Sequence, residues 1–169
     1  MTETIVVTGC AGFIASHTCE KLLKEGNIVV GIDNMNDYYD VKIKENNVKL
    51  LEKYEKFTFY KEDIRDTKII SKVKPNKVCH LASTAGVRYS IQNPSLYVDV
   101  NINGFINILE ECVKNNVKQL VYASSSSVYG LNKKLPFSEK DPVNHPSQFY
   151  AATKRSNELM AHSYSCIYG

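Results

Sequence analysis

The chain has 169 residues, of which 43% are hydrophobic and 23% charged, and its formal net charge at pH 7 is +3. These proportions are ordinary for a globular protein, and the length suits one domain with a single sizeable core. The small positive surplus, without a basic stripe, gives no reason to expect nucleic-acid binding. No apolar run approaches the length that spans a bilayer, so we expect neither nucleic acid nor a membrane among the partners.

The cysteines indicate where the protein works. Five of them are scattered along the chain, namely Cys10, Cys19, Cys79, Cys112 and Cys166. An odd, scattered set, in a chain that we expect to lack a signal peptide, is typical of reduced thiols in a cytoplasmic protein. A metal site is the alternative, but the adjacent Cys79 and His80 lack ligand spacing and a second pair. We therefore predict that Cys79 is a buried thiol and not a metal ligand, and we expect no metal.

Short apolar runs alternate with longer helical patterns along the chain. The predicted strands are 5–8, 28–33, 57–60, 77–81 and 119–124, and the predicted helices are 13–25, 40–54, a long one within 94–114, and 148–168. This alternation predicts an α/β fold, a Rossmann-like doubly wound parallel sheet of about five strands with helices on both faces. The one extended loop, 131–147, holds three prolines, and loops of such length tend to be functional.

A glycine loop joins the first strand to the first helix. Gly9 and Gly12 permit a tight turn, so that backbone N–H groups at the helix start, where Phe13 and Ile14 lie, can approach a pyrophosphate. Asp33 follows the second strand, where a carboxylate accepts hydrogen bonds from the adenosine ribose and repels a 2′-phosphate. The pattern therefore predicts a dinucleotide site that favours NAD over NADP; the alternative is a glycine turn that only caps a helix.

Tyr150 and Lys154 are four residues apart, which places both on one face of a helix. An ammonium beside a phenol favours the phenolate, and that makes a proton acceptor near neutral pH. The serine run 124–127 precedes the pair. A cofactor loop, a serine and a Tyr/Lys pair in this order favour redox chemistry on an alcohol. The alternative is a tyrosine with a satisfied hydroxyl beside a solvated lysine.

Several longer segments point to one family. They are Gly-Ile-Asp-Asn-Met-Asn-Asp-Tyr-Tyr-Asp at 31–40, Ala-Gly-Val-Arg-Tyr-Ser at 85–90, Tyr-Val-Asp-Val-Asn-Ile-Asn-Gly at 97–104, Tyr-Ala-Ser-Ser-Ser-Ser-Val-Tyr-Gly at 122–130 and Tyr-Ala-Ala-Thr-Lys at 150–154. In these segments the chain resembles the extended short-chain dehydrogenases/reductases, specifically the NAD-dependent epimerase/dehydratase family, and most closely its UDP-glucuronate 4-epimerases.

This resemblance implies roles for individual residues. Tyr150 would be the general base, Lys154 its partner and a ligand of the nicotinamide ribose, and Ser125 the hydroxyl that hydrogen-bonds the reacting sugar oxygen. Arg88 and Ser126 would contact the UDP-sugar, although a surface ion pair and a loop hydroxyl are the respective alternatives. The implied contacts to NAD are Gly9, Gly12, Phe13, Ile14, Asp33, Asn34, Asp63, Ile64, Leu81, Ala82, Ser83, Asn101, Tyr150 and Lys154.

The implied reaction is a 4-epimerisation by transient oxidation at C4. Tyr150 would take the proton of the sugar 4-hydroxyl while NAD accepts a hydride and returns it to the opposite face. Members of the family that are 4,6-dehydratases carry two carboxylates where this chain has Ser126 and Ser127, so an epimerase is favoured over a dehydratase. The resemblance also implies a homodimer and a role in polysaccharide biosynthesis.

Members of this family are longer than 169 residues and continue into a smaller substrate-binding domain. We therefore expect residues 1–169 to form an NAD-binding domain, truncated before the substrate-binding domain. On this interpretation the isolated chain binds NAD weakly and turns over a UDP-sugar negligibly. The alternative is a NAD-binding module that has no catalytic activity. A simpler UDP-hexose also remains open as the substrate.

Overall fold

The computed structural model describes residues 2–169, which form two compact units. Unit 1 comprises residues 2–82 and Glu110–Ala123, and unit 2 comprises Ser83–Leu109 and Ser124–Gly169. None of the helices within residues 2–169 is long and apolar enough to cross a membrane.

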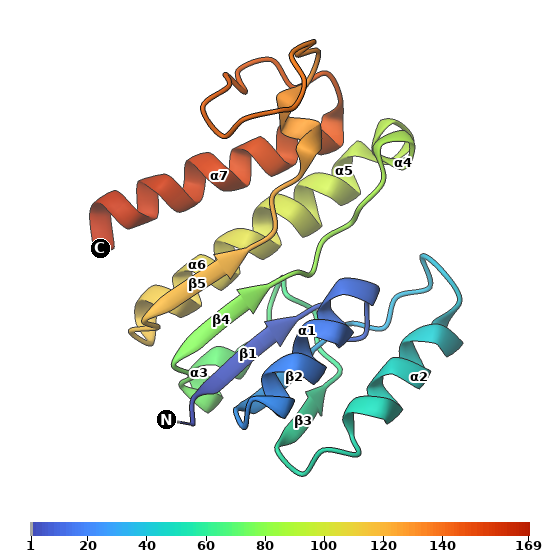
Figure 1. The fold of residues 1–169 in the computed structure, drawn as a ribbon, viewed down its shortest axis with the longest axis vertical. Helices are drawn as coiled ribbons and strands as arrows, with labels where there is room; N and C mark the ends of the chain where they lie inside the picture. Colours follow the sequence, from blue (N-terminus) through green and yellow to red (C-terminus); the bar gives the residue numbers. More distant parts are fainter. Residues whose placement is uncertain (1) are drawn as a thin grey trace. The chain divides into compact units, whose positions relative to one another are not determined.

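Unit 1 is built on a parallel sheet. Its strands lie in the order β3-β2-β1-β4-β5, and every neighbouring pair is parallel, as the arrows of Figure 1 show. The predicted Rossmann-like sheet of five strands is therefore confirmed. The elements of unit 1 are β1 (Thr4–Thr8), α1 (Phe13–Lys24), β2 (Ile28–Ile32), α2 (Val41–Leu51), β3 (Phe57–Tyr60), α3 (Ile69–Val73), β4 (Lys77–His80) and β5 (Gln119–Tyr122).

The core of unit 1 forms because β1 is a run of β-branched residues buried on both faces, as parallel strands usually are. Ile5 and Val7 belong to a cluster that also takes in Ala15 and Cys19, which lie one turn apart on α1. The helix ends at Lys24, and Gly26 follows with φ +87°, a left-handed conformation that closes helices and suits glycine. The predicted helix 13–25 is thus confirmed to within one residue.

The register of the sheet brings three loops to one edge. Thr8, the last residue of β1, pairs with Ile32 of β2 and with His80 of β4. The segments that follow these strands therefore leave the sheet together. The strand order also reverses between β1 and β4, and ligands of doubly wound folds bind at such a switch point, outside the carboxyl ends of the strands.

Unit 2 is helical. Its elements are α4 (Val87–Gln92), α5 (Pro94–Tyr97), the π-helix η1 (Val98–Asn103), the 3₁₀ helix η2 (Ser126–Tyr129) and α7 (Phe149–Tyr168); α6 (Gly104–Lys114) begins here and ends in unit 1. The predicted helix within 94–114 therefore has a π-helical centre. No helix or strand occurs between η2 and α7, as expected for 131–147. The short helices α3, α4 and η2 were not predicted, because four to six residues show too little periodicity.

Candidate functional site

The glycine loop of unit 1 is a tight turn that approaches a neighbouring strand end. The Gly9 N–H donates to the Ile32 carbonyl at 2.7 Å, and the Gly12 N–H donates back to the Gly9 carbonyl at 2.8 Å. Gly9 has φ +74°, and a Cβ there would lie 2.9 Å from the Ala82 backbone. Only glycine fits this position without strain, because both the conformation and the space exclude a side chain.

Helix α1 begins directly after this turn, and its first backbone N–H groups have no capping side chain. Gly12 is its N-cap residue, no side chain caps the helix, and the first turn holds no acidic residue. Phe13 and Ile14, which open the helix, are exposed. The orphan N–H groups and the positive end of the helix dipole therefore suit an anionic group such as a pyrophosphate.

Asp33 follows β2 and is buried, with 8% of its surface exposed. Its Oδ1 accepts a hydrogen bond from the Met35 N–H at 2.8 Å, and its Oδ2 accepts one from the Ala11 N–H at 3.3 Å. The Lys44 ammonium lies 3.7 Å from Oδ1. The carboxylate is thus held from both sides, and it faces the glycine loop through Ala11.

Asn34 and Asp63 meet although 29 positions separate them in the chain. The Asn34 Nδ2 donates to Asp63 Oδ2 at 2.9 Å, and Arg65 donates to both carboxylate oxygens. Partial burial works against ionisation, but the hydrogen bonds from Arg65 and Asn34 outweigh it and hold the pKa of Asp63 at about 2. Ile64 is buried beside them. The predicted residues Asn34 and Asp63 are therefore in contact, and the buried Ile64 follows Asp63 in the chain.

Leu81 and Ala82 are held by a residue that the sequence did not single out. The Thr8 hydroxyl oxygen accepts hydrogen bonds from the N–H groups of Leu81 and Ala82, both at 3.1 Å, and lies 2.8 Å from His80 Nδ1. Two accepted bonds leave its proton to be donated, so His80 Nδ1 acts as the acceptor. Thr8 is the last residue before the glycine loop, and that position is the only signal by which the sequence could have identified it.

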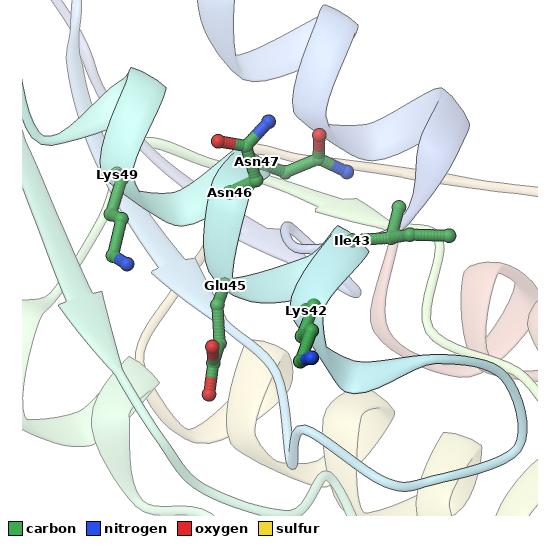
Figure 2. A pocket seen from close by; sticks show the side chains of 6 residues that line it. All are labelled: Lys42, Ile43, Glu45, Asn46, Asn47 and Lys49. Carbon is green, nitrogen blue, oxygen red and sulfur yellow. The ribbon is translucent and has the colours of Figure 1, made fainter.

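Figure 2 shows a shallow hollow along α2, lined by Lys42, Ile43, Glu45, Asn46, Asn47 and Lys49. The six side chains radiate around the helix and do not converge on one centre. Asn47 is already engaged, because its Nδ2 donates to the Ala11 carbonyl at 2.9 Å. The hollow therefore lacks a converging set of polar groups. Within residues 2–169, no group of three or more His, Cys, Asp or Glu side chains is placed to hold a metal ion.

In unit 2, Asn101 joins three segments. Its Oδ1 accepts from the Ser83 hydroxyl at 3.0 Å and from the Thr84 N–H at 2.8 Å. Its Nδ2 donates to the Thr84 carbonyl at 3.0 Å and to the Thr153 hydroxyl at 3.2 Å. Asn101 lies in the π-helix η1, and such distortions are frequent at functional sites. The predicted residues Asn101 and Ser83 are therefore in contact, and Thr153 connects them to α7.

Tyr150 and Lys154 both lie in α7, one turn apart. The Tyr150 N–H donates to the Ser90 hydroxyl at 3.1 Å, and its ring packs edge-on against Tyr97 with centroids 6.1 Å apart. Lys154 is buried, with 4% of its surface exposed. Burial lowers the pKa of Lys154 from 10.5 to about 8, because a low-dielectric environment disfavours the charged form. The lysine is therefore not the solvated charge of the alternative interpretation.

Ser125 precedes η2, which packs against α7. Its Oγ accepts a hydrogen bond from the Ser127 N–H at 3.2 Å and lies 3.0 Å from the Ser127 hydroxyl. Ser126, the first residue of η2, is exposed. Arg88 is also exposed, on α4, which packs against α7. These predicted residues therefore all lie on elements that border α7.

Glu158 was not predicted, although it follows Lys154 by one further helical turn. Its Oε1 accepts a hydrogen bond from the Ser124 hydroxyl at 2.5 Å, and its Oε2 pairs with Arg155 at 2.8 Å. The hydrogen bond between Ser124 and Glu158 joins α7 to the residue immediately before Ser125. The repeated four-residue spacing of Tyr150, Lys154 and Glu158 was the available signal.

Similar proteins support one family. The family model described as GDP-mannose 4,6 dehydratase matches residues 6–169. The chain is 53% identical to Protein CapI of Staphylococcus aureus over 97% of its own length and 50% of that protein. It is 48% identical to UDP-glucuronate 4-epimerase 4 of Arabidopsis thaliana, over 98% of its own length and 39% of that protein.

A solved structure agrees with these relatives. The crystal structure of UDP-glucuronic acid 4-epimerase from Bacillus cereus, in complex with UDP-glucuronic acid and NAD, matches with a TM-score of 0.89 and 37% identity, covering 98% of this chain and 53% of that one. The chain thus spans about half the length of the relatives that it matches. Two of these relatives are UDP-glucuronate 4-epimerases, which agrees with the resemblance to NAD-dependent epimerases/dehydratases. Because the family model covers nearly all of the chain, the chain belongs to the GDP-mannose 4,6-dehydratase family.

Proposed function

We propose that this chain is the NAD-binding part of a nucleotide-sugar 4-epimerase that interconverts UDP-glucuronate and UDP-galacturonate. The observation that carries the proposal is the pair of Tyr150 and Lys154 on α7, with the lysine buried and its pKa lowered to about 8. Such a pair suits proton transfer at a hydroxyl. The choice of UDP-glucuronate is supported by the names of the Arabidopsis and Bacillus relatives.

Unit 1 fits NAD. The start of α1 is bare and lies beyond a turn that leaves no room for a Cβ at Gly9, which suits a pyrophosphate. Asp33 would accept hydrogen bonds from the adenosine ribose, and the cluster of Asn34 and Asp63 would lie towards the adenine. A bound nicotinamide would supply the hydride acceptor and donor for the sugar carbon.

The side chains of unit 2 would move and hold the proton. Tyr150 would accept it from the sugar 4-hydroxyl and return it, and Lys154 would stabilise the phenolate by its charge. With a pKa of about 8, the lysine keeps that charge at neutral pH. The Ser125 hydroxyl would donate a hydrogen bond to the reacting oxygen. Asn101 would hold Ser83 and the neighbouring backbone in place for the cofactor.

The name of the family model makes a 4,6-dehydratase the competing function. Dehydration needs a further acid and base near the serine. Ser126 and Ser127 follow Ser125 and carry no carboxyl group. Glu158 does contact the serine run, but its two oxygens are engaged by Ser124 and Arg155. These contacts favour the epimerase.

We further propose a cytoplasmic homodimer with a role in polysaccharide biosynthesis. All five cysteines are free, which suits a reducing compartment. The second half of α7 exposes Leu159, Ile167 and Tyr168, a set of apolar side chains that a second copy of the chain would cover. Size-exclusion chromatography with light scattering would test the dimer, since a monomer at every concentration contradicts it.

Two experiments test the function. The first titrates NAD into the 169-residue chain by calorimetry, where we expect weak binding and negligible turnover of UDP-glucuronate. The second joins this chain to the remaining half of the Bacillus cereus enzyme and follows UDP-glucuronate by proton NMR. We expect UDP-galacturonate to form, and Tyr150→Phe to abolish it.

The products and the control distinguish the alternatives. A 4-keto-6-deoxy sugar would establish a dehydratase. A chimera that folds and binds NAD without any conversion would favour the non-catalytic module. Conversion of a UDP-hexose, but not of UDP-glucuronate, by the chimera would reassign the substrate. A chain that binds no NAD would refute the proposal.

A further inference from the structure

A buried ion pair lies beside the glycine loop in unit 1. The Lys44 Nζ is 3.7 Å from Asp33 Oδ1, and the two side chains are 6% and 7% exposed. Lysine is almost never so buried unless it is paired. Lys44 is one of three lysines on α2, and it is the one that is buried, so its burial calls for a physical reason.

The loop between β2 and α2 wraps around the ammonium. Lys44 donates a hydrogen bond to Asn36 Oδ1 at 2.9 Å, and its Nζ lies 4.9 Å from the centre of the Tyr39 ring. Met35 adopts φ +56° where its N–H reaches Asp33. The cation is therefore surrounded by a carboxylate, an amide oxygen and an aromatic face, each of which attracts a positive charge.

This arrangement changes the electrostatics of the ribose end of the site. A carboxylate alone would repel a 2′-phosphate, but here the carboxylate and the ammonium together have no net charge. Discrimination between NAD and NADP then depends on which of the two charged groups lies closer to the 2′ position of the ribose. Asp33 also contacts Ala11 of the glycine loop, whereas the other contacts of Lys44, a buried residue of α2, are to Asn36 and Tyr39.

We propose that Lys44 determines cofactor selectivity together with Asp33: the lysine anchors the carboxylate that would meet the ribose hydroxyls, and the carboxylate in turn masks a cation that would otherwise bind a 2′-phosphate. The inference rests on the proposed binding of NAD to unit 1. It makes the site a latent one for NADP, because removal of the carboxylate leaves a buried ammonium whose flexible stem lets it reach an incoming phosphate.

The test uses the full chain and binding alone. The affinities for 5′-ADP, 2′,5′-ADP, NAD and NADP are measured by calorimetry for the wild type, Asp33→Asn and Asp33→Asn/Lys44→Met. We expect Asp33→Asn to shift the ratio of affinities towards the 2′-phosphorylated ligands by about tenfold or more, because they pair the orphaned cation. In the double variant we expect that shift to fall to about threefold or less.

Matched variants separate Lys44 from general positive charge. Lys42 lies on the same helix with an exposed side chain (Figure 2), so Asp33→Asn/Lys42→Met should keep the full shift. Asp33→Asn/Lys44→Arg should also keep it, because the cation is retained. Thermal melting gives a second reading, since 2′,5′-ADP should raise the Tm of Asp33→Asn more than that of the double variant, which no longer buries an unpaired charge.

The binding measurements distinguish failure of the Lys44 inference from failure of the proposed function. An equal shift with and without Lys44, or no binding of 2′,5′-ADP to Asp33→Asn, overturns the inference even if the wild type binds NAD. If the wild type binds no NAD while Asp33→Asn binds 2′,5′-ADP through Lys44, the ion-pair inference stands and the proposed function fails. A double variant that does not fold leaves Lys44→Gln in the same background to decide between these results.

Discussion

Replacing Lys154 by methionine tests whether the helix α7 carries a charge that destabilises the fold. Burial lowers the pKa of this lysine from 10.5 to about 8. A tenfold change in proton affinity is worth about 1.4 kcal/mol, so the charged form costs the folded state about 3 kcal/mol. Such costs are common where a site needs a group that the fold would not otherwise bury.

The sign and the pH window follow from the two pKa values. Below pH 8 the lysine is protonated in the folded and unfolded states, and the full cost is present. Between pH 8 and 10.5 the unfolded chain binds more protons than the folded one, so wild-type stability rises with pH. Methionine binds no proton, so its advantage should be about 3 kcal/mol at pH 7, about 2 at pH 9 and about 1 at pH 10.

Urea unfolding of the wild type and Lys154→Met at these three pH values measures the difference. Contacts of Lys154 that the variant loses shift the whole curve, but they leave its slope unchanged, so the decline of about 2 kcal/mol between pH 7 and 10 is the decisive quantity. Lys49→Met, at an exposed position on α2, is the control and should change stability by less than about 0.5 kcal/mol. A Lys154→Met difference that does not vary with pH would refute the reasoning.

Three further predictions concern single side chains. Gly9→Ala should lower the free energy of unfolding by about 2–3 kcal/mol and weaken NAD binding, because a Cβ there meets backbone 2.9 Å away at φ +74°. Asn101→Ala should cost about 2–3 kcal/mol, measured by urea unfolding, since it leaves buried hydrogen-bonding partners unsatisfied. Iodoacetamide at pH 8 should label the exposed Cys166 first, whereas Cys19, whose pKa burial raises to about 12, should react only on unfolding.

Each of these three predictions has its own control or readout. Gly26→Ala, with φ +87° but nothing within 4 Å of its Cβ, should cost only about 1–2 kcal/mol; an equal loss at both glycines would mean that the close approach is irrelevant. Asn103→Ala alters an exposed neighbour of Asn101 and should stay within about 0.5 kcal/mol. Peptide mass spectrometry reads the labelling, and a Cys19 adduct that forms as fast as that of Cys166 would contradict the assigned burial.

Local patterns in the sequence carried the fold and much of the candidate site. The alternation of β-rich runs and helical periods predicts the parallel sheet, because neighbouring residues alone decide those periods. The glycine loop and the four-residue spacing of Tyr150 and Lys154 are likewise short-range. The π-helical centre of 94–114 was not predictable, because its spacing departs only slightly from that of an α-helix.

The sequence by itself therefore determined the α/β architecture, the glycine turn and the shared helix face of Tyr150 and Lys154. Only the tertiary structure decided that Lys44 is buried against Asp33, that Asn101 joins Ser83 to Thr153, and that Glu158 reaches Ser124. The partners in each pair belong to different elements or loops, 11 to 52 positions apart in the chain (44 − 33 for the first pair). Whether a polar side chain is solvated or buried depends on the partner that folding brings to it, and no local period encodes that partner.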